Sequence, residues 1–440
     1  MGWREIYNSK LTTSKDAVNH INSGNRVVTG HAAAEPLVLI DAIVENKDNY
    51  ENVEIVHMVP LGNGKYTEEG MQKHFRHNAI FLGKAISEAV NCGRADFTPC
   101  YFYEVPKLFE DSLPVDVALI QVSTPDENGY CSFGVSIDYT KPAAENAKLV
   151  IAEVNKQMPR TYGNSVIHVS EIDYIVEVDY KIKELNPPKI GDVEIEIGKH
   201  CAKLVEDGST LQLGIGAIPD AVLMSLKDKK DLGIHSEMIS DGVVELVECG
   251  VINNSKKTLH KDKMVVTFLM GTEKLYDFVN NNDTIEMHPV NYVNDPTVIM
   301  QNSKLISINS CVEVDLMGQV CSESIGLKQI SGVGGQVDFV RGANMCKDGK
   351  SIIAMPSTTA NKKVSKIVPF LKHGSVVTTG RCDVDYIVTE FGVAKLKGRT
   401  LKQRAKALIN IAHPDFKEEL IKEYENRFKC EYEVKEALSY

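Results

Sequence analysis

A carboxylate follows a short apolar run near the middle of the chain, in the stretch His235-Ser236-Glu237-Met238-Ile239-Ser240-Asp241-Gly242. Residues 232–235 predict a buried strand, so Glu237 would lie at the carboxyl end of that strand, where open α/β sheets hold their ligands. A glutamate in this place can act as a base or as a covalent nucleophile. A solvated loop carboxylate is the commoner role of any single Glu, so position alone leaves both interpretations open.

A glycine-rich segment is the second candidate, Ser331-Gly332-Val333-Gly334-Gly335-Gln336-Val337-Asp338-Phe339. Three glycines in four positions permit positive φ angles or a close approach of the backbone to a ligand. Consecutive N–H groups there can form an anion-binding nest or an oxyanion hole. A plain turn is the alternative, but glycines at this density between apolar runs favour a functional loop.

The third candidate is the turn Gly214-Ile215-Gly216-Ala217-Ile218-Pro219, between a predicted strand at 210–213 and a predicted helix. Glycines before a helix N-terminus allow contact with a phosphate or nucleotide. A tight turn without a ligand is equally compatible with the pattern. Pro219 stands where a dinucleotide fingerprint needs glycine, which disfavours a nicotinamide enzyme.

Other chemistries find little support in the sequence. His74 and His77 are three residues apart with no third ligand near them, so we expect a surface helix there and no metal site. The chain has neither a G-x-S-x-G nor a P-loop pattern, which argues against a serine hydrolase and a P-loop enzyme.

Composition limits the partners. The 440 residues are 43% hydrophobic, and 49 Lys and Arg against 60 Asp and Glu give a net charge of −11. Nucleic-acid binders and basic membrane-surface proteins normally carry a positive field, so neither partner is expected. No segment approaches the ~20 apolar residues of a membrane span. The ten cysteines include no C-x-x-C pair, which predicts a reducing, cytoplasmic location.

Strands and helices alternate in the sequence pattern. Residues 26–30 predict a strand, 35–43 a helix and 53–56 a second strand, and the apolar runs 115–122 and 148–154 are typical of buried parallel strands. This alternation predicts an α/β fold with open parallel sheets. The polar, extended segment around Pro187-Pro188 predicts a domain boundary, with domains at 1–187 and 188–440.

The second half repeats the order of the first. Pro219 falls opposite Pro36, and the segment from His235 to Met238 lies near the register of His57-Met58. A repeat of this kind predicts two related α/β domains that face each other across a cleft.

Six motifs in order resemble the acetyl-CoA hydrolase/transferase family over essentially the whole chain, and within it the transferases that use C4 acids such as 4-hydroxybutyrate and butyrate. The motifs are Gly214 to Val222, Gly233 to Met238, Val314 to Val320, Gly332 to Phe339, Tyr386 to Gly392 and Ile411 to Phe416. The resemblance implies two similar open-sheet α/β CoA-transferase domains with the active site in the cleft between them. It also implies a homodimer.

The resemblance further implies roles for individual residues. Glu237 would be the nucleophile that carries a glutamyl-CoA thioester, and Gly334 and Gly335, with Val59, would stabilise the oxyanions. The residues implied to contact CoA are Gln212, Leu213, Gly214, Ile215, Gly216, Val312 and Gly335. CoA enters as a substrate, so no permanently bound cofactor and no metal are expected. The partners implied are acyl-CoA and short-chain carboxylic acids.

Three other functions compete with a CoA-transferase. A hydrolase of the same family would let water replace the acceptor acid. A nicotinamide oxidoreductase would use the 214–219 turn, against the evidence of Pro219. A non-catalytic CoA-binding protein would not need Glu237.

Overall fold

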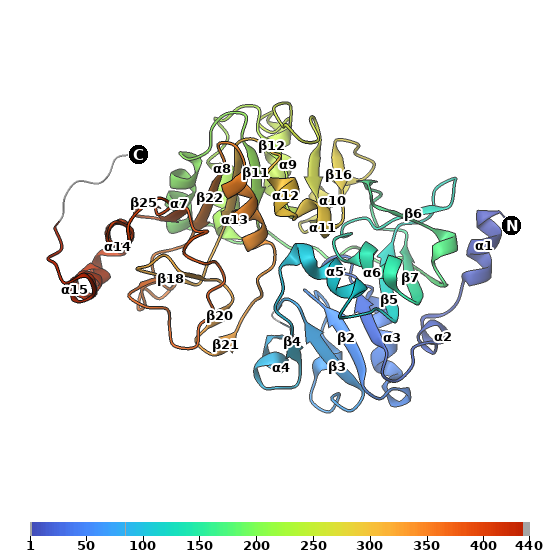
Figure 1. Cartoon of the computed structure of the whole chain (residues 1–440). Coiled ribbons are helices and arrows are strands. Elements are labelled where there is room, and N and C mark those ends of the chain that lie inside the picture. Colours follow the sequence, from blue (N-terminus) through green and yellow to red (C-terminus); the bar gives the residue numbers. More distant parts are fainter. Residues whose placement is uncertain (1, 84, 434–440) are drawn as a thin grey trace.

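Two open β-sheets organise the chain (Figure 1). This computed structural model describes residues 2–83 and 85–433. The first sheet is parallel throughout, because buried runs such as Val117–Val122 pair on both sides. In spatial order its strands are β10 (Tyr174–Val178), β7 (Leu149–Asn155), β5 (Val117–Val122), β1 (Arg26–Thr29), β2 (Val53–His57), β3 (Phe75–Ala79) and β4 (Asp96–Phe97).

The second sheet is parallel except at its last pair of strands. Its strands in spatial order are β12 (Gly233–Ile234), β11 (Thr210–Leu213), β17 (Leu305–Asn309), β22 (Lys350–Ala354), β24 (Tyr386–Thr389) and β25 (Gly392–Lys395). Smaller sheets join β14 (Met264–Val266), β16 (Ile285–Met287) and β8 (Tyr162–Gly163); β13 (Met238–Ile239) and β15 (Phe268–Leu269); β19 (Val320–Cys321), β18 (Glu313–Asp315) and β23 (Ile367–Val368); β20 (Ser324–Ile325) and β21 (Lys328–Gln329); and β6 (Tyr130–Ser132) and β9 (Val166–His168).

The strand orders of the two halves correspond. The first strand of each half, β1 or β11, lies between the second strand, β2 or β12, and a later one, β5 or β17. A parallel bridge from His235 to Val265 continues the second sheet from β12 toward β14 and β16, as β3 and β4 continue the first. Pro36 precedes α3 (Leu37–Glu45), the helix that follows β1, and Pro219 lies in the first turn of α8 (Ala217–Met224), the helix that follows β11. The α/β fold with two similar open-sheet halves is therefore confirmed.

Helices flank both sheets. In the first half they are α1 (Trp3–Lys10), α2 (Ser14–Val18), α3 (Leu37–Glu45), α4 (Ser87–Asn91), α5 (Val105–Glu110) and α6 (Thr140–Asn146). In the second half they are α7 (Asp192–Ala202), α8 (Ala217–Met224), α9 (Asp241–Glu248), α10 (Glu273–Val279), α11 (Val290–Val293), α12 (Pro296–Ile299), α13 (Gln336–Met345), α14 (Leu401–Asn410) and α15 (Lys417–Phe428).

The second sheet is covered on both faces. Side chains alternate along β17, so Ile306 and Ile308 belong to the same buried cluster as Ile197 of α7, whereas Leu305 belongs to the cluster that contains Phe339 of α13. The burial of both faces is reflected in Leu305, Ile306 and Ile308, which are all almost fully buried. This packing also fixes α13, and with it the glycine-rich segment that precedes this helix, at one edge of the sheet.

The sequence prediction of a helix at His74 and His77 was wrong. His74 and His77 were expected on a surface helix, but His77 lies in strand β3, 1% exposed, with its Nδ1 at 2.9 Å from the Ile55 carbonyl oxygen. This segment forms a strand and not a helix because Phe75, His77 and Ala79 alternate with a period of two and share the buried face of the strand. Near the carboxyl end, α14 (Leu401–Asn410) and α15 (Lys417–Phe428) are helical, and residues 434–440 lie outside the described residues.

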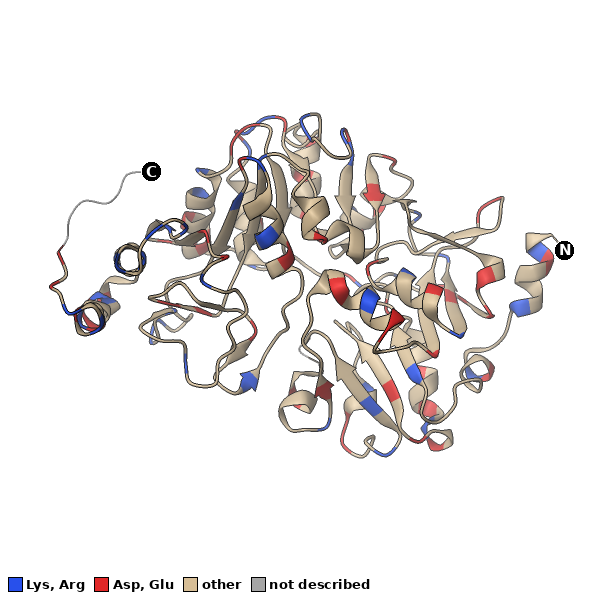
Figure 2. Cartoon of the chain, viewed as in Figure 1, with Lys and Arg blue, Asp and Glu red and all other residues tan. Residues whose placement is uncertain are grey.

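The predicted domain boundary lies in a segment without regular secondary structure. Residues 179–191 contain no helix or strand and run between the two halves. Basic and acidic residues are interspersed along the ribbon of both halves (Figure 2). Among residues 2–83 and 85–433, no helix combines the length and the apolar composition needed to cross a bilayer.

Candidate active site

Glu237 lies between β12 and β13, directly after the buried strand that the sequence predicted. Its main-chain carbonyl accepts hydrogen bonds from the N–H groups of Thr267 (3.0 Å) and Phe268 (3.1 Å). The preceding Ser236 hydroxyl donates to the Leu213 carbonyl at 3.1 Å. Because the backbone is held on both sides, the direction of the Glu237 side chain is fixed.

The Glu237 carboxylate is held by two donors. Oε2 accepts a hydrogen bond of 2.8 Å from the Asn294 side-chain amide, and the carboxylate also accepts one from the Gly335 N–H. Burial raises the pKa of Glu237 to about 7, and the Asn294 hydrogen bond opposes this rise. A carboxylate whose pKa is matched to neutral pH, at the end of a sheet strand, is a candidate nucleophile.

Gly335 is a glycine because the Glu237 carboxylate occupies the space that a side chain would need. A Cβ atom built at Gly335 would overlap Glu237 Oε2 and Asn294 Nδ2. Gly335 has φ of −92°, so close approach, and not backbone strain, selects glycine here. Its neighbour Gly334 has φ of +54°, the left-handed region that favours glycine.

The glycine-rich segment also meets the first half of the chain. The Phe102 N–H donates to the Gly334 carbonyl at 3.2 Å, and a Cβ at Gly332 would lie 2.9 Å from the Ile80 carbonyl oxygen. The sequence-predicted Glu237, Gly334 and Gly335 are thus brought together where the two halves touch.

Two residues at the site were missed by the sequence analysis, Asn294 and Asp338. Asn294 follows α11 and is fully buried, and Asp338 lies in the first turn of α13, 1% exposed. Asp338 Oδ2 accepts from the Tyr103 N–H at 3.2 Å and lies 3.4 Å from Asn294 Nδ2. Burial, reinforced by the negative charge of Glu237, raises the pKa of Asp338 well above its usual range. Asp338 stood inside a quoted motif, but no pattern marked Asn294.

A buried histidine contributes from the first half. His31 is 2% exposed, and its Nδ1 lies 2.8 Å from Asp138 Oδ2. Its ring packs edge-on against Phe268 at 4.8 Å between ring centres, and Phe268 holds the Glu237 main chain. His31 lowers the pKa of Glu237, and Asp138 raises it. The His31–Asp138 pair therefore tunes the charge of the candidate nucleophile.

The other implied site residues are placed as follows. Val59 follows β2, is partly exposed and accepts a hydrogen bond from the Ala32 N–H at 3.2 Å. Val312 precedes β18 and donates its N–H to the Cys321 carbonyl at 2.8 Å. Both positions lie beyond the carboxyl ends of strands, β2 and β17, as ligand-contacting residues of open sheets do. Their contacts with a ligand stay predictions.

The strand and turn at 212–216 have an interior part and an exposed part. The Gln212 side chain is buried and accepts hydrogen bonds from Ser307 Oγ (2.7 Å) and Asn309 Nδ2 (3.1 Å), and Leu213 is 3% exposed. Residues 214–216 lead to the N-terminus of α8, and Ile215 is exposed. The turn is therefore more accessible to a ligand than the strand.

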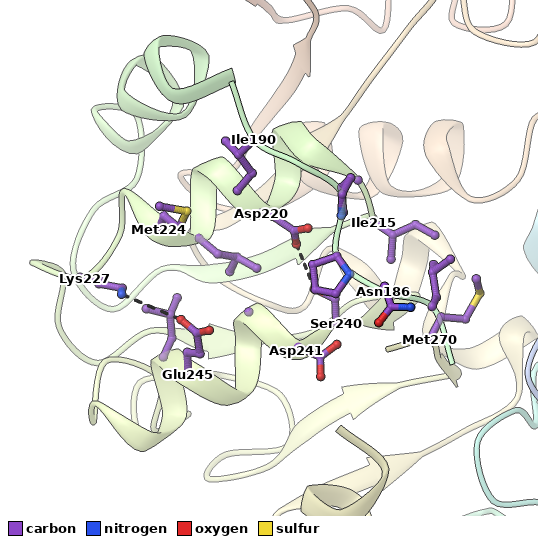
Figure 3. A pocket seen from close by; sticks show the side chains of 17 residues that line it. Asn186, Ile190, Ile215, Asp220, Met224, Lys227, Ser240, Asp241, Glu245 and Met270 are labelled. Carbon is purple, nitrogen blue, oxygen red and sulfur yellow. Dashed lines mark hydrogen bonds and ion pairs between the residues drawn. The ribbon is translucent and has the colours of Figure 1, made fainter. Parts of the chain in front are cut away.

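A cavity of about 580 Å³ adjoins this turn (Figure 3). Ile215 and Gly216 form one side of it, and residues 185–188 and Met270 form another. Asp220, Asp241 and Glu245 also reach its wall, as Figure 3 shows. Because these carboxylates repel phosphate, the apolar part of the cavity suits an uncharged chain better than a phosphate group.

Comparison with known proteins identifies the family. Residues 1–185 match the acetyl-CoA hydrolase/transferase N-terminal domain, and residues 271–424 match the acetyl-CoA hydrolase/transferase C-terminal domain. The chain belongs to the acetyl-CoA hydrolase/transferase family. The family predicted from the six motifs is thereby confirmed.

Relatives within the family cover nearly the whole chain. The 4-hydroxybutyrate coenzyme A transferase of Clostridium kluyveri is 68% identical over 97% of this chain and 100% of its own length. The succinyl-CoA:cyclohexane-1-carboxylate CoA transferase of Geobacter metallireducens is 49% identical over 95% of each chain. The crystal structure of a 4-hydroxybutyrate CoA-transferase from Porphyromonas gingivalis superposes with a TM-score of 0.84 at 47% identity, over 97% of this chain and 100% of that one. An acetyl-CoA hydrolase of Yarrowia lipolytica is more distant, 27% identical over 79% of this chain and 75% of its own.

Proposed function

We propose that this member of the acetyl-CoA hydrolase/transferase family is a CoA-transferase that moves CoA between acetate and a short C4 acid, 4-hydroxybutyrate or butyrate. The observation that carries the proposal is the Glu237 carboxylate, held by Asn294 against the Gly335 backbone. The 68% identity to a 4-hydroxybutyrate coenzyme A transferase supports the choice of acid. A homodimer and a cytoplasmic location stay predictions.

In the first half-reaction, Glu237 acts as the nucleophile. Its carboxylate attacks the thioester carbonyl of an acyl-CoA, the C–S bond breaks, and a mixed acyl-glutamyl anhydride and free CoA thiolate result. The thiolate then attacks the glutamyl carbonyl and expels the first carboxylate. A glutamyl-CoA thioester remains on the enzyme, and an incoming carboxylate reverses both steps. Every step exchanges one activated acyl group for another, so the reaction needs neither ATP nor a redox partner.

Each addition creates a negative oxygen that must be stabilised. The Gly335 N–H already points at the Glu237 carboxylate, so it is suited to stabilise the oxyanion that forms on the glutamyl carbonyl. Gly334 shapes this loop through its positive φ, and the Val59 segment of the first half is our candidate for the oxyanion on the substrate side.

CoA must be retained while its sulfur changes partners. We assign its binding to the exposed turn at 214–216, with Gln212 and Leu213 supporting the turn from the sheet, and to Val312 and Gly335. The cavity beside the turn has room and apolar walls for the uncharged pantetheine arm. Binding energy from the remote part of CoA can then drive formation of the reactive anhydride.

A hydrolase is the second candidate, because water in place of the acceptor acid completes the same chemistry. It is less favoured because the acetyl-CoA hydrolase named above is only 27% identical. Initial rates measured with acetyl-CoA, with and without 4-hydroxybutyrate or butyrate, separate the two. We expect turnover that depends on the acceptor, with parallel double-reciprocal lines. Release of free CoA at the same rate without an acceptor would make the protein a hydrolase.

A further inference from the structure

Three side chains that bind metals in proteins meet in the second half of the chain, and none has a role in the proposed transfer. They are His260, Glu286 and His288. His260 Nδ1 lies 2.7 Å and His288 Nε2 lies 3.2 Å from the same oxygen, Glu286 Oε2. One ligand atom from each residue can be chosen so that all three lie within 4.8 Å of one another. A single small cation could therefore contact all three.

The local fold supplies this convergence from two directions. Glu286 lies in strand β16, and His288 follows two positions later, so both side chains point to the same face of the strand. His260 reaches them from the loop between α9 and β14, where its φ is +49°. Because His260 is 26 residues before Glu286 in the sequence, no short motif marks the cluster.

A further residue orients one of the histidines. His260 Nε2 lies 2.7 Å from the Tyr292 hydroxyl of α11, which leaves Nδ1 free to face Glu286. Metal-binding histidines typically use their second ring nitrogen in a hydrogen bond of this kind, which fixes the tautomer and the ring direction.

The surroundings allow a metal ion to enter. The three side chains are 18–24% exposed, so a bound ion would keep access to water for a remaining coordination position. The buried Lys257 lies near Glu286, but its Nζ donates to the main-chain carbonyls of Ile234 and Lys263, both at 2.7 Å. Burial lowers the pKa of Lys257 to about 7, so its positive charge is readily lost near neutral pH.

We propose that His260, Glu286 and His288 form a binding site for a divalent transition-metal ion of the zinc class, with Tyr292 orienting His260. Two imidazoles and one carboxylate are a donor set that such ions accept, whereas magnesium and calcium prefer oxygen donors alone. The ion would join the loop before β14 to α11. Asn294, which holds Glu237, directly follows α11, so we assign the ion a structural role beside the active site.

The test is direct binding to the full-length protein after treatment with a chelator. Zn²⁺ is titrated calorimetrically, and Co²⁺ is followed by its visible absorption, which reports a site with nitrogen ligands. We expect one ion per chain and a higher melting temperature with Zn²⁺. Loss of a ligand in His260→Gln or His288→Gln should weaken binding more than 100-fold, and Tyr292→Phe should weaken it about 10-fold.

The matched control is His413→Gln. His413 lies 3.6 Å from Asp415, two positions on, and so resembles His288 and Glu286 without a second histidine. This variant should bind Zn²⁺ as the parent protein does. Absence of Zn²⁺ binding by the parent, or equal binding by His260→Gln and His288→Gln, would overturn the proposal and leave the cluster as ion pairs alone. Since the readout is binding and not turnover, the result is independent of the proposed transferase activity.

Discussion

Asn294 donates a hydrogen bond of 2.8 Å to Glu237 Oε2, and the same nitrogen lies 3.4 Å from the carboxyl of Asp338. One fully buried amide thus stands between two acidic groups whose pKa values are both raised, that of Glu237 to about 7. Because the Asn294 amide does not titrate, it remains a hydrogen-bond donor whatever the charge of the two carboxyls.

Asn294→Leu removes the donor that favours ionised Glu237. The parent enzyme should gain activity as the pH rises through about 7, because only the carboxylate is a nucleophile. In the variant the pKa of Glu237 should rise further, so the midpoint of the pH–rate profile should move to higher pH. We expect kcat to fall 10- to 100-fold at pH 7. A profile with an unchanged midpoint would show that Asn294 does not control the charge of Glu237.

Gly335→Ala introduces a methyl group where Glu237 Oε2 and Asn294 Nδ2 now lie. We expect a loss of transferase activity of at least 100-fold, with larger damage in Gly335→Val. Gly380→Ala is the matched control, because a Cβ there would meet no atom within 4 Å and its φ is not positive. Steady-state rates of the purified variants, with circular dichroism to confirm folding, make the comparison. Activity of Gly335→Ala equal to that of Gly380→Ala would contradict the geometry of the site.

Asp338→Asn should be nearly neutral for activity. The raised pKa means that Asp338 is protonated over a wider pH range in the folded state than in the unfolded state, where its pKa is near 3.8. Folding therefore gains from the neutral carboxyl below pH 3.8, and this contribution is lost as the pH rises toward the folded-state pKa.

Asn is neutral at every pH, so Asp338→Asn should reduce the loss of stability between pH 4 and the folded-state pKa. Urea unfolding of both proteins at several pH values measures this difference. Identical pH dependence in the two proteins would show that Asp338 does not titrate with a raised pKa.

Asp138→Leu tests the buried pair in the first half. Asp138 accepts hydrogen bonds from the Tyr139 N–H (2.6 Å), from the Ser136 hydroxyl and from His31 Nδ1. Leucine leaves these buried donors without a partner, which should cost about 2–4 kcal/mol of unfolding free energy. Asp111→Leu, at an exposed ion pair with Lys107, should cost far less. Equal destabilisation in denaturant titrations would contradict the importance of burial.

The sequence pattern predicted the parts of the fold that depend on local order. Residues 115–122 and 148–154 were expected as buried strands, and β5 and β7 occupy them. The correspondence of Pro36 with Pro219 anticipated two sheets of the same topology. These predictions succeeded because a strand buried on both faces needs a continuous apolar run, and the structure of such a run is set by its own residues.

The sequence could not predict which side chains from distant segments meet at the site. Asn294 and Asp338 reach Glu237 only because β12 and α11 end, and α13 begins, close to one another in the fold. His77 was misjudged for the same reason, because its burial comes from pairing with β2 and not from its neighbours in the chain. The position of Glu237 after a strand made it a candidate base or nucleophile, the family resemblance implied the role of nucleophile, and its contacts came from the structure.

The most direct test of the account is the intact mass of the protein after incubation with butyryl-CoA in the absence of an acceptor acid. We predict a stable gain equal to one CoA less one water, located on the peptide that contains Glu237 and absent from Glu237→Gln. Addition of acetate should discharge the adduct as acetyl-CoA. An adduct of the same mass on Glu237→Gln, or acetate-dependent turnover by that variant within tenfold of the parent, would contradict the assignment of Glu237 as the nucleophile.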